Sequence, residues 1–596
     1  NNILGGSSGS GLYFGSTSTS ATIHQNEFNG GSFSSDGLFF DGGSDTYTDL
    51  TISNNDIFDA GIFAGGKIYG STGVEMSGNL LDGADANLSS AFESALVTGN
   101  VFRGNLYTNA QMGLKNSTVS YNVFECAGPS PGPGYPSYAL MLWGDQYGLT
   151  PSQNVTLEGN VFYYNEVAIG EIANGLRILS GIDASTITVS DNSFEDGGAQ
   201  SGAYAIVNQG TGTADASGSW WDTADPSGVA AAISGSVDYT PWLANGTDTG
   251  DPGFQGDFSE LWVDDDSPQG GGGGGRIQEG IDLVSGSTVS VAAGTYNEKV
   301  TIDKSVDLLG EDGAIIDGNG LNYEGVFIDA GDVTLDNFEI RNFATGAGVL
   351  LWVDDDYFDG WTDVVITNNE IHDVGDDAWG FGIYVGTESE RLDPSHGLYD
   401  PGMTGLLDFT GLTISGNEIY NTSGAALTLQ SLESTGDMLD ISDNYIHDSA
   451  MSGIWIDSCW DLDVSGNQID GNVNGIFVSS YSDGYYEYDP TGPYDPTNIA
   501  ITGNIISGNS AQGVAVYDLS CGGVVVNSNS IYGNGSGGVL NNVSLCTLDA
   551  EYNWWGAADG PSGFGPGSGD AVSDYIDFDP YRSSNVVFGP DPQVIS

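Results

Sequence analysis

Positive charge is scarce in this chain of 596 residues. Lys and Arg together number 10, whereas Asp and Glu number 81, which gives a formal net charge of −71 at pH 7. Proteins that bind nucleic acid or anionic lipid carry basic patches, so this charge balance excludes both classes of partner. Acidity alone does not imply disorder, because 39% of the residues are hydrophobic and 11% are aromatic. We therefore expect a folded chain.

Cysteine, proline and long apolar runs are also sparse. Four Cys are too few for a disulfide scaffold, and none forms the CxxC pair of a zinc site. No run approaches the roughly 18 apolar residues that a membrane-spanning helix requires. With 19 Pro and no Gly-X-Y period, collagen is excluded, so the 92 Gly are expected in turns.

The chain opens at Asn1 without a charged and then apolar signal segment. Two interpretations stay open: a processed, exported protein, or a segment cut from a longer chain. The acidic composition favours an extracellular setting at a cell surface or in saline medium, because acidic surfaces keep proteins soluble.

One short phrase recurs: an alternating strand, then Ser or Thr, any residue, Asn, any residue, and an apolar residue. Two of its copies are ThrIleSerAsnAsn at 51–55 and LeuValThrGlyAsn at 96–100. The period of two predicts strands, and the step after each Asn predicts a tight corner. The recurring Asn residues are Asn55, Asn79, Asn100, Asn122, Asn160, Asn192, Asn369, Asn417, Asn444, Asn467, Asn504, Asn529 and Asn553.

Neighbouring copies of the phrase lie as little as 21 residues apart, as from Asn79 to Asn100. This is the length of one coil of a parallel β-solenoid. A repeat of this size cannot bury its apolar face alone, so the coils must stack at the strand spacing of about 4.8 Å. Stacking predicts a structural ladder of buried Asn side chains, at bends where Asn tolerates unusual backbone angles.

The chain resembles the right-handed parallel β-helix repeat proteins, the pectin-lyase-like superfamily in its broad sense. The resemblance is most specific at 276–310, which is similar to the opening of such domains, and at 553–581, which is similar to their close. A weaker closing segment stands at 219–242. The resemblance implies an all-β fold of two tandem right-handed parallel β-helices, with a short amphipathic cap helix on the second.

These segments predict the domain organisation. The first β-helix should span residues 1–250 with an uncapped N-terminal end, because nothing in it matches the opening at 276–310. An acidic and glycine-rich linker should span 251–275. The second β-helix should span 276–596, with its cap helix at 276–284 and its closing segment at 553–582. Ile277, Ile281 and Val284 support the cap helix, since they fall at helical spacing.

The superfamily includes pectate lyases, polygalacturonases and alginate epimerases, but the residues argue against catalysis. Such lyases need a basic residue beside a uronate, and this chain has few. Asp376 and Asp377 are a possible counterpart of the paired hydrolase aspartates, yet the motifs around that pair are missing. His372, Tyr420 and His447 each follow a ladder Asn by three positions and should form one stripe. We favour a polar stack over an acid-base or metal cluster, and we predict no catalytic and no cofactor-binding residue.

Two copies of LeuTrpValAspAspAsp offer carboxylates for Ca²⁺, which prefers six to eight oxygen ligands. The candidate ligands are Asp264, Asp265, Asp266, Asp354, Asp355 and Asp356. Cys521 and Cys546 occupy the same phase of consecutive coils, so a disulfide between them is possible and would suit export.

An uncapped coil exposes backbone donors and acceptors that recruit further strands. The leading hypothesis is therefore an extracellular structural protein, the subunit of a cell-surface layer, sheath or filament, which assembles head to tail into a homo-polymer. The alternative is an extracellular polysaccharide-binding adhesin, or a polysaccharide lyase or hydrolase.

Overall fold

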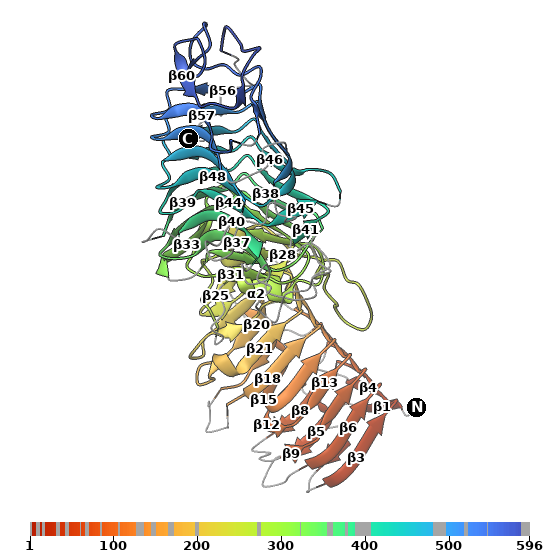
Figure 1. Cartoon of the computed structure of the whole chain (residues 1–596). Helices are drawn as coiled ribbons and strands as arrows, with labels where there is room; N and C mark the ends of the chain where they lie inside the picture. Colours follow the sequence, from red (N-terminus) through yellow and green to blue (C-terminus); the bar gives the residue numbers. More distant parts are fainter. Residues whose placement is uncertain are drawn as a thin grey trace, which may run out of the picture. The chain divides into compact units, whose positions relative to one another are not determined.

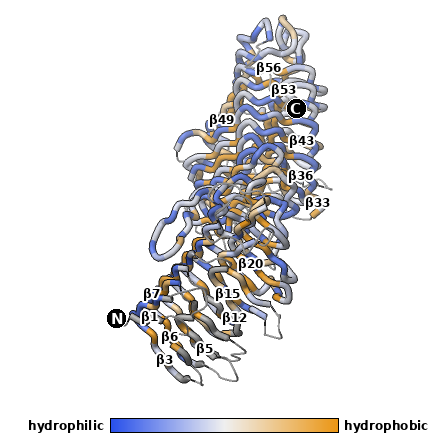
Figure 2. The backbone as a smooth tube through the Cα atoms, turned by 180° about the vertical axis from the view of Figure 1, so that it is seen from behind, coloured by the Kyte–Doolittle hydropathy of each residue, from blue (hydrophilic) through white to orange (hydrophobic). Residues whose placement is uncertain are grey.

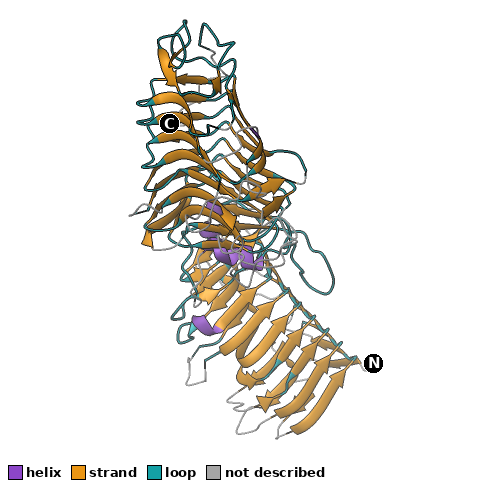
Figure 3. Ribbon diagram, in the orientation of Figure 1, coloured by secondary structure: helices purple, strands orange, loops and turns teal. Residues whose placement is uncertain are grey.

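The chain divides into two compact units, Asn1–Gly286 and Ser287–Ser596, and each is described by itself. Strands dominate both units (Figure 3). The computed structural model describes residues 3–6, 12–14, 18–30, 36–41, 47–59, 61–65, 71–83, 86–104, 108–126, 136–144, 151–164, 172–196, 202–270, 276–321, 324–353, 362–375, 380–387, 407–434, 436–480, 496–517, 523–544 and 546–585.

Unit 1 is a stack of parallel strands (Figure 1). One sheet runs through β1 (Ile3–Gly6), β4 (Glu27–Gly30), β7 (Asp56–Phe58), β11 (Leu80–Asp82), β14 (Val101–Arg103), β16 (Val123–Glu125), β19 (Val161–Tyr163) and β22 (Ser193–Glu195). The other strands of the stack are β2 (Leu12–Phe14), β3 (Ser18–His24), β5 (Asp36–Asp41), β6 (Tyr47–Ser53), β8 (Gly61–Gly65), β9 (Ser71–Thr72), β10 (Glu75–Ser77), β12 (Ala86–Glu93), β13 (Leu96–Thr98), β15 (Thr108–Ser120), β17 (Ser137–Leu142), β18 (Gln153–Glu158), β20 (Ala173–Ile178), β21 (Ile187–Ser190), β23 (Ile206–Asn208), β24 (Ala214–Asp215), β25 (Ile233–Ser234) and β26 (Val237–Asp238).

Unit 2 repeats the design with three sheets, and in its first coils each strand pairs with the third strand after it. The first sheet holds β29 (Thr288–Val291), β32 (Val306–Gly310), β35 (Val333–Asp336), β38 (Val364–Thr367), β42 (Leu412–Ser415), β46 (Leu439–Ser442), β49 (Trp460–Ser465), β52 (Thr497–Thr502), β55 (Val524–Asn527), β58 (Leu548–Asp549) and β61 (Ile576–Asp577). The second holds β30 (Gly294–Tyr296), β33 (Ala314–Leu321), β36 (Glu339–Phe343), β39 (Glu370–Val374), β43 (Glu418–Thr422), β47 (Tyr445–His447), β50 (Gln468–Asp470), β53 (Ile505–Ser507) and β56 (Ser530–Tyr532). The third holds β31 (Val300–Ile302), β34 (Val326–Ile328), β37 (Ala347–Val353), β40 (Phe381–Thr387), β44 (Leu427–Gln430), β48 (Ser452–Asp457), β51 (Asn474–Ser479), β54 (Gln512–Val516), β57 (Gly537–Asn541), β59 (Pro561–Gly563) and β60 (Gly569–Val572). Strands β41 (Leu407–Phe409) and β45 (Leu432–Ser434) form a separate two-stranded parallel sheet.

The predicted ladder of Asn side chains is confirmed in both units. Each ladder Asn is at most 1% exposed, and its side-chain oxygen accepts hydrogen bonds from the coil before it. Thus Asn444 donates to the Oδ1 atom of Asn467 from its backbone N at 3.0 Å and from its Nδ2 atom at 2.9 Å. The bend differs from the expectation in one respect, because the positive φ falls on the residue before the Asn, such as Gly466 at 70°. The Asn itself points inward.

Apolar residues fill the interior of the coils, as the alternation predicts, and hydrophobic and hydrophilic stretches alternate along the tube in Figure 2. In unit 1 the position two residues after the ladder Asn forms a column of stacked rings. Phe102, Phe124, Phe162 and Phe194 stack at centroid distances of 4.8 to 5.1 Å, and Trp221 continues the column 5.0 Å from Phe194.

The first coil of unit 1 has strand partners on one side only within the described residues. Strand β1 pairs with β4, β2 with β5, and β3 with β6. This arrangement leaves one edge of each strand without a described partner, and an uncapped N-terminal end stays a prediction.

Residues 251–270, expected to be part of a linker, instead pack along unit 1. Strand β28 (Glu260–Val263) pairs antiparallel with β27 (Trp242–Leu243), and Gly256 N donates to the Asp191 carboxylate at 2.9 Å. The expected helix is present as α2 (Arg276–Leu283), with Ile277 and Ile281 buried. Two further short helices occur, η2 (Ala184–Thr186) and α1 (Pro226–Ala231). The boundaries of independent domains stay predictions.

Candidate functional site

Aromatic side chains gather on the outer surface of the third sheet of unit 2. Trp352, Tyr384, Trp455, Phe477 and Tyr517, here called the aromatic face, come from β37, β40, β48, β51 and the residue after β54, and all are partly exposed. Their ring centroids lie 5.6 Å apart for Trp352 and Tyr384, 6.1 Å for Trp455 and Phe477, and 5.3 Å for Phe477 and Tyr517. Partly exposed apolar groups clustered in this way are typical of a binding surface.

Parallel pairing places three of these rings in one outward column. Tyr384 pairs with Thr428, Thr428 with Trp455, and Trp455 with Phe477. Trp352 pairs instead with Gly386. Gly386 lies in the next outward column, and a Cβ there would approach the Tyr384 ring to 2.7 Å. The absence of a side chain at this position therefore lets the tyrosine ring lie across the strand.

A polar group lies within the aromatic face. The Trp455 indole Nε1 donates to Ser479 Oγ at 3.1 Å, and Ser479 Oγ donates to Asp457 Oδ1 at 3.1 Å. Gln430 pairs in register with Asp457, and Tyr384 OH donates to the Gln430 side-chain oxygen. The face thus combines flat apolar rings with hydroxyl, amide and carboxylate groups.

Burial raises the pKa values of two ionisable groups in the aromatic face, Asp457 and Tyr384. Asp457 is 7% exposed, and its burial raises the pKa of the carboxyl to about 6 against the opposing effect of the serine hydrogen bonds. Burial also raises the pKa of Tyr384, with a smaller contribution from the negative charge of Asp457. Thr428 Oγ1, 3% exposed at the residue level, has no hydrogen-bond partner.

The sequence analysis missed this face. In the sequence Trp352 belongs to an acidic phrase, and the intervals between the five aromatic residues are irregular. A signal was available, since each follows an inward apolar residue by one position and therefore points outward.

The predicted stripe of His372, Tyr420 and His447 is present on the second sheet. The rings stack at centroid distances of 4.7 and 4.9 Å with interplanar angles of 5° and 7°. Each histidine lies between two carboxylates, as His372 does with Asp373 at 2.8 Å and Glu339 at 3.2 Å. The histidine side chains are only 11% and 14% exposed, so their faces are occupied by neighbouring rings. The three rings thus form one stack with carboxylates at its edges, and the absence of an acid-base or metal role stays a prediction.

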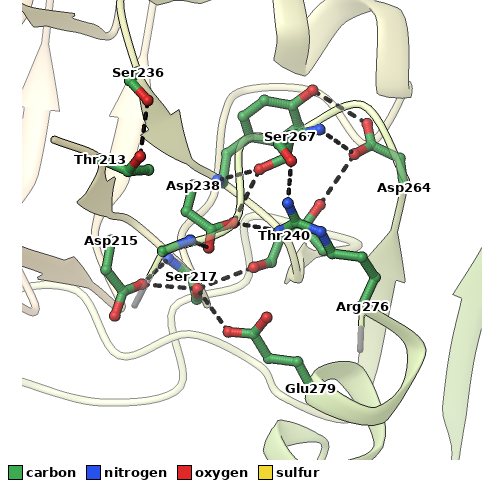
Figure 4. A network of polar contacts seen from close by, with 12 residues as sticks. Thr213, Asp215, Ser217, Ser236, Asp238, Thr240, Asp264, Ser267, Arg276 and Glu279 are labelled. Carbon is green, nitrogen blue, oxygen red and sulfur yellow. Dashed lines mark hydrogen bonds and ion pairs between the residues drawn. The ribbon is translucent and has the colours of Figure 1, made fainter. Parts of the chain in front are cut away.

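Asp264, a candidate calcium ligand, belongs to a hydrogen-bond network in unit 1 (Figure 4). Its carboxylate accepts from Thr240 Oγ1 at 3.1 Å, Tyr239 OH at 3.3 Å and Ser267 N at 3.3 Å. Burial raises the pKa of Asp264 above its usual range. The Asp264 carboxylate is therefore already hydrogen-bonded to three donors of the protein itself.

A buried ion pair forms the other half of this network. Arg276, at the start of α2, binds Asp238 at 2.7 Å, and Glu279 accepts from Ser217 Oγ at 3.3 Å (Figure 4). Burial raises the pKa of Glu279 to about 7, and the charges of Asp238 and Asp215 add to the shift while Arg276 opposes it. The network ties α2 to the last coils of unit 1.

The remaining metal and acid candidates do not converge on a site. Asp265 and Asp266 are exposed, and Asp354, Asp355, Asp356, Asp376 and Asp377 lie outside the described residues. Within the described ranges, no three His, Cys, Asp or Glu side chains are grouped to hold a metal. A calcium site therefore stays a prediction.

The cysteines divide into two classes. Cys126 and Cys459 are free and buried, and burial raises the pKa of each thiol to about 12. Cys546 is disulfide-bonded, whereas Cys521, its predicted partner, lies outside the described residues. The pairing of these two residues stays a prediction.

The sequence of unit 2 matches a known family. The model described as "Right handed beta helix region" matches residues 306–486 and 396–549. The chain contains a right-handed parallel β-helix. All five rings of the aromatic face lie within the matched residues. No curated protein sequence matches the chain.

The chain is similar to several solved structures at low sequence identity. The periplasmic alginate epimerase AlgG is 8% identical, over 90% of this chain and 76% of its own, with a TM-score of 0.22. The A-module of the Azotobacter vinelandii mannuronan C-5 epimerase AlgE4 is 12% identical, over 83% and 87%, with a TM-score of 0.21. The PL6 family alginate lyase AlyGC is 11% identical, over 93% and 96%, with a TM-score of 0.17. These low TM-scores transfer no site or activity to this chain. Of the helices in the described residues, none has the length and hydropathy of a membrane-spanning segment.

Proposed function

We propose that this protein is an exported β-helix protein that binds an uncharged polysaccharide on the aromatic face of unit 2. The observation that carries the proposal is the set of partly exposed rings on neighbouring coils, with Gln430, Asp457 and Ser479 among them. Binding surfaces for small and linear ligands combine apolar rings with a few polar groups that fix orientation.

A sugar chain suits this surface for two reasons. Pyranose rings present flat C–H faces that pack on aromatic rings, and their hydroxyl groups both donate and accept hydrogen bonds. The face offers the side-chain amide of Gln430 and the hydroxyl of Ser479, with the Asp457 carboxylate beside them. Rings from β37, β40, β48 and β51 follow one another along the β-helix, so a linear polymer would meet several of them at once.

The net charge selects among polysaccharides. A chain with a formal charge of −71 repels a polyanion over distances of a Debye length, about 8 Å at physiological ionic strength. An uncharged polysaccharide does not meet this barrier. The disulfide at Cys546 supports an oxidising compartment outside the cytoplasm.

The test is binding of the full-length protein to a panel of neutral oligosaccharides by isothermal titration calorimetry. We expect Trp455→Ala and Tyr384→Ala each to weaken binding at least about tenfold, since each removes an anchoring ring. The matched control is Trp460→Ala, which removes a partly exposed tryptophan from the first sheet. Equal losses in Trp455→Ala and Trp460→Ala, or no binding by the natural sequence, would reject the proposal.

Self-association is a second candidate function, favoured by the first coil of unit 1. Its strands β1, β2 and β3 have described partners on one side only, and open strand edges pair with further strands. Such contacts would build a surface layer or filament from copies of this chain. Sedimentation over a wide concentration range is the test: concentration-dependent growth supports assembly, and a monomer throughout rejects it.

A further inference from the structure

Arg177 is unusual among the basic residues of this acidic chain. Arg103 pairs with Asp82 at 2.9 Å and Arg276 with Asp238 at 2.7 Å, and Arg341 likewise binds Asp317. Arg177, in β20 of unit 1, forms no ion pair with any residue that the structure describes. In a chain with 81 Asp and Glu, a guanidinium without a carboxylate partner calls for an explanation.

The guanidinium of Arg177 is nevertheless held in place. Its Nε and Nη2 atoms donate to Gln209 Oε1 at 3.2 and 2.9 Å, and its Cζ atom lies 4.8 Å from the centroid of the Tyr138 ring. These contacts fix both the plane and the direction of the group. Fixing it in advance reduces the entropy that a ligand must later offset.

The surroundings of Arg177 carry no charge along its column. Its register partners are Met141 on the coil before and Val207 on the coil after. Arg177 is partly exposed, and Gln209 is exposed beside it. Of the five N–H donors of a guanidinium, two bind Gln209, and the Nη1 donors have no partner among the residues that the structure describes.

We infer that Arg177, held by Gln209 and Tyr138, binds an oxyanion, a carboxylate or a sulfate, carried by an otherwise uncharged oligosaccharide. A planar guanidinium fork matches two oxygens of such a group. Met141 and Val207 add apolar contact area at its sides. The sparse charge of the ligand matters, because the net charge of the protein opposes a densely charged polymer. The oxyanion site belongs to unit 1 and does not need the aromatic face of unit 2, whereas the choice of a sugar chain as carrier rests on the proposed function.

The experiment titrates the full-length protein with three oligosaccharides that share one neutral backbone: an unmodified form, a form with one carboxylate and a form with one sulfate. We expect a charged form to bind at least about tenfold more tightly than the neutral form, with the advantage shrinking as salt is added. The charged form that binds more tightly than the neutral form shows whether the oxyanion is a carboxylate or a sulfate. Equal binding of all three forms would overturn the inference.

Three variants assign the effect to this site. Arg177→Gln should remove the preference for the charged form, and Arg177→Lys should keep only part of it, because lysine lacks the planar fork. Gln209→Ala should weaken the preference severalfold by freeing the guanidinium. The matched control is Arg103→Gln, which removes an arginine already paired with Asp82 and should leave the preference unchanged. A preference that survives Arg177→Gln would contradict the inference, and Gln209→Ala gives the same decision if Arg177→Gln fails to fold.

Discussion

At the scale of single residues, the fold depends on one pair of neighbours, the ladder Asn and the residue before it. The first residue takes a positive φ, which explains the frequent Gly, Asn and Asp there, as at Gly466 and Asp443. The second turns its amide inward and bonds to the coils on both sides. The sequence predicted the ladder because both roles are local and recur in every coil.

Asn467→Ala should therefore destabilise unit 2 by about 2–3 kcal/mol. The substitution leaves the backbone N of Asn444 and the carbonyl of Ile441 without the partner they have at 3.0 and 2.8 Å. Chemical denaturation measures the loss. The control is Gln468→Ala, the adjacent amide whose side chain instead bonds to Asp470 on the outside; a comparable loss in both variants would show that burial of the amide is not the cause.

A second residue-scale prediction concerns Glu279 in the network of Figure 4. Its pKa in the folded chain is raised from 4.5 to about 7, so its contribution to stability is fully present below about pH 4.5 and is lost as pH rises through 7. Glu279→Gln removes a charge that faces Asp238 and Asp215. Allowing for partial exposure, we expect the variant to be more stable by about 1 kcal/mol at pH 8 and unchanged at pH 4.5.

Thermal melts of both proteins across this pH range measure the difference. Loss of stability in Glu279→Gln at pH 8 would mean that Arg276 outweighs the two carboxylates, and a difference that does not vary with pH would exclude ionisation of Glu279 as its cause.

At the scale of elements, a coil is stable only when it packs against its neighbours. Most of the stabilising free energy therefore comes from side chains that stack between coils in the interior. The Phe column of unit 1 follows from the apolar residue two positions after each ladder Asn, and this much could be predicted from the repeat. The path of residues 251–270 could not be predicted from the sequence. Their acidic and glycine-rich composition indicates a linker, yet contacts such as that of Gly256 with Asp191 are specific to this fold.

Phe124→Ala should destabilise unit 1 by about 3–5 kcal/mol, because it opens a cavity between Phe102 and Phe162 in a fully buried column. Phe124→Leu should cost less, since it keeps most of the volume. Hydrogen exchange of the strands β14, β16 and β19 measures where protection is lost. Loss confined to β16 alone would contradict a column that couples successive coils.

At the scale of the whole molecule, the sequence indicated the fold better than the site. Ladder positions recur at short and regular intervals, whereas Trp352, Tyr384 and Trp455 lie 32 and 71 residues apart because insertions of different length separate their strands. Only the register of β37, β40, β44 and β48 brings them onto one surface. The acidic triplets stood out in sequence instead, and Asp264 is engaged inside unit 1.

The most direct measurement is an experimental structure of the protein with a bound neutral oligosaccharide selected from the binding panel. The account predicts sugar rings packed on Tyr384 and Trp455, with hydroxyl groups bonded to Gln430, Ser479 or Asp457. An oligosaccharide bound elsewhere, with the five rings of the aromatic face uncovered, would contradict it.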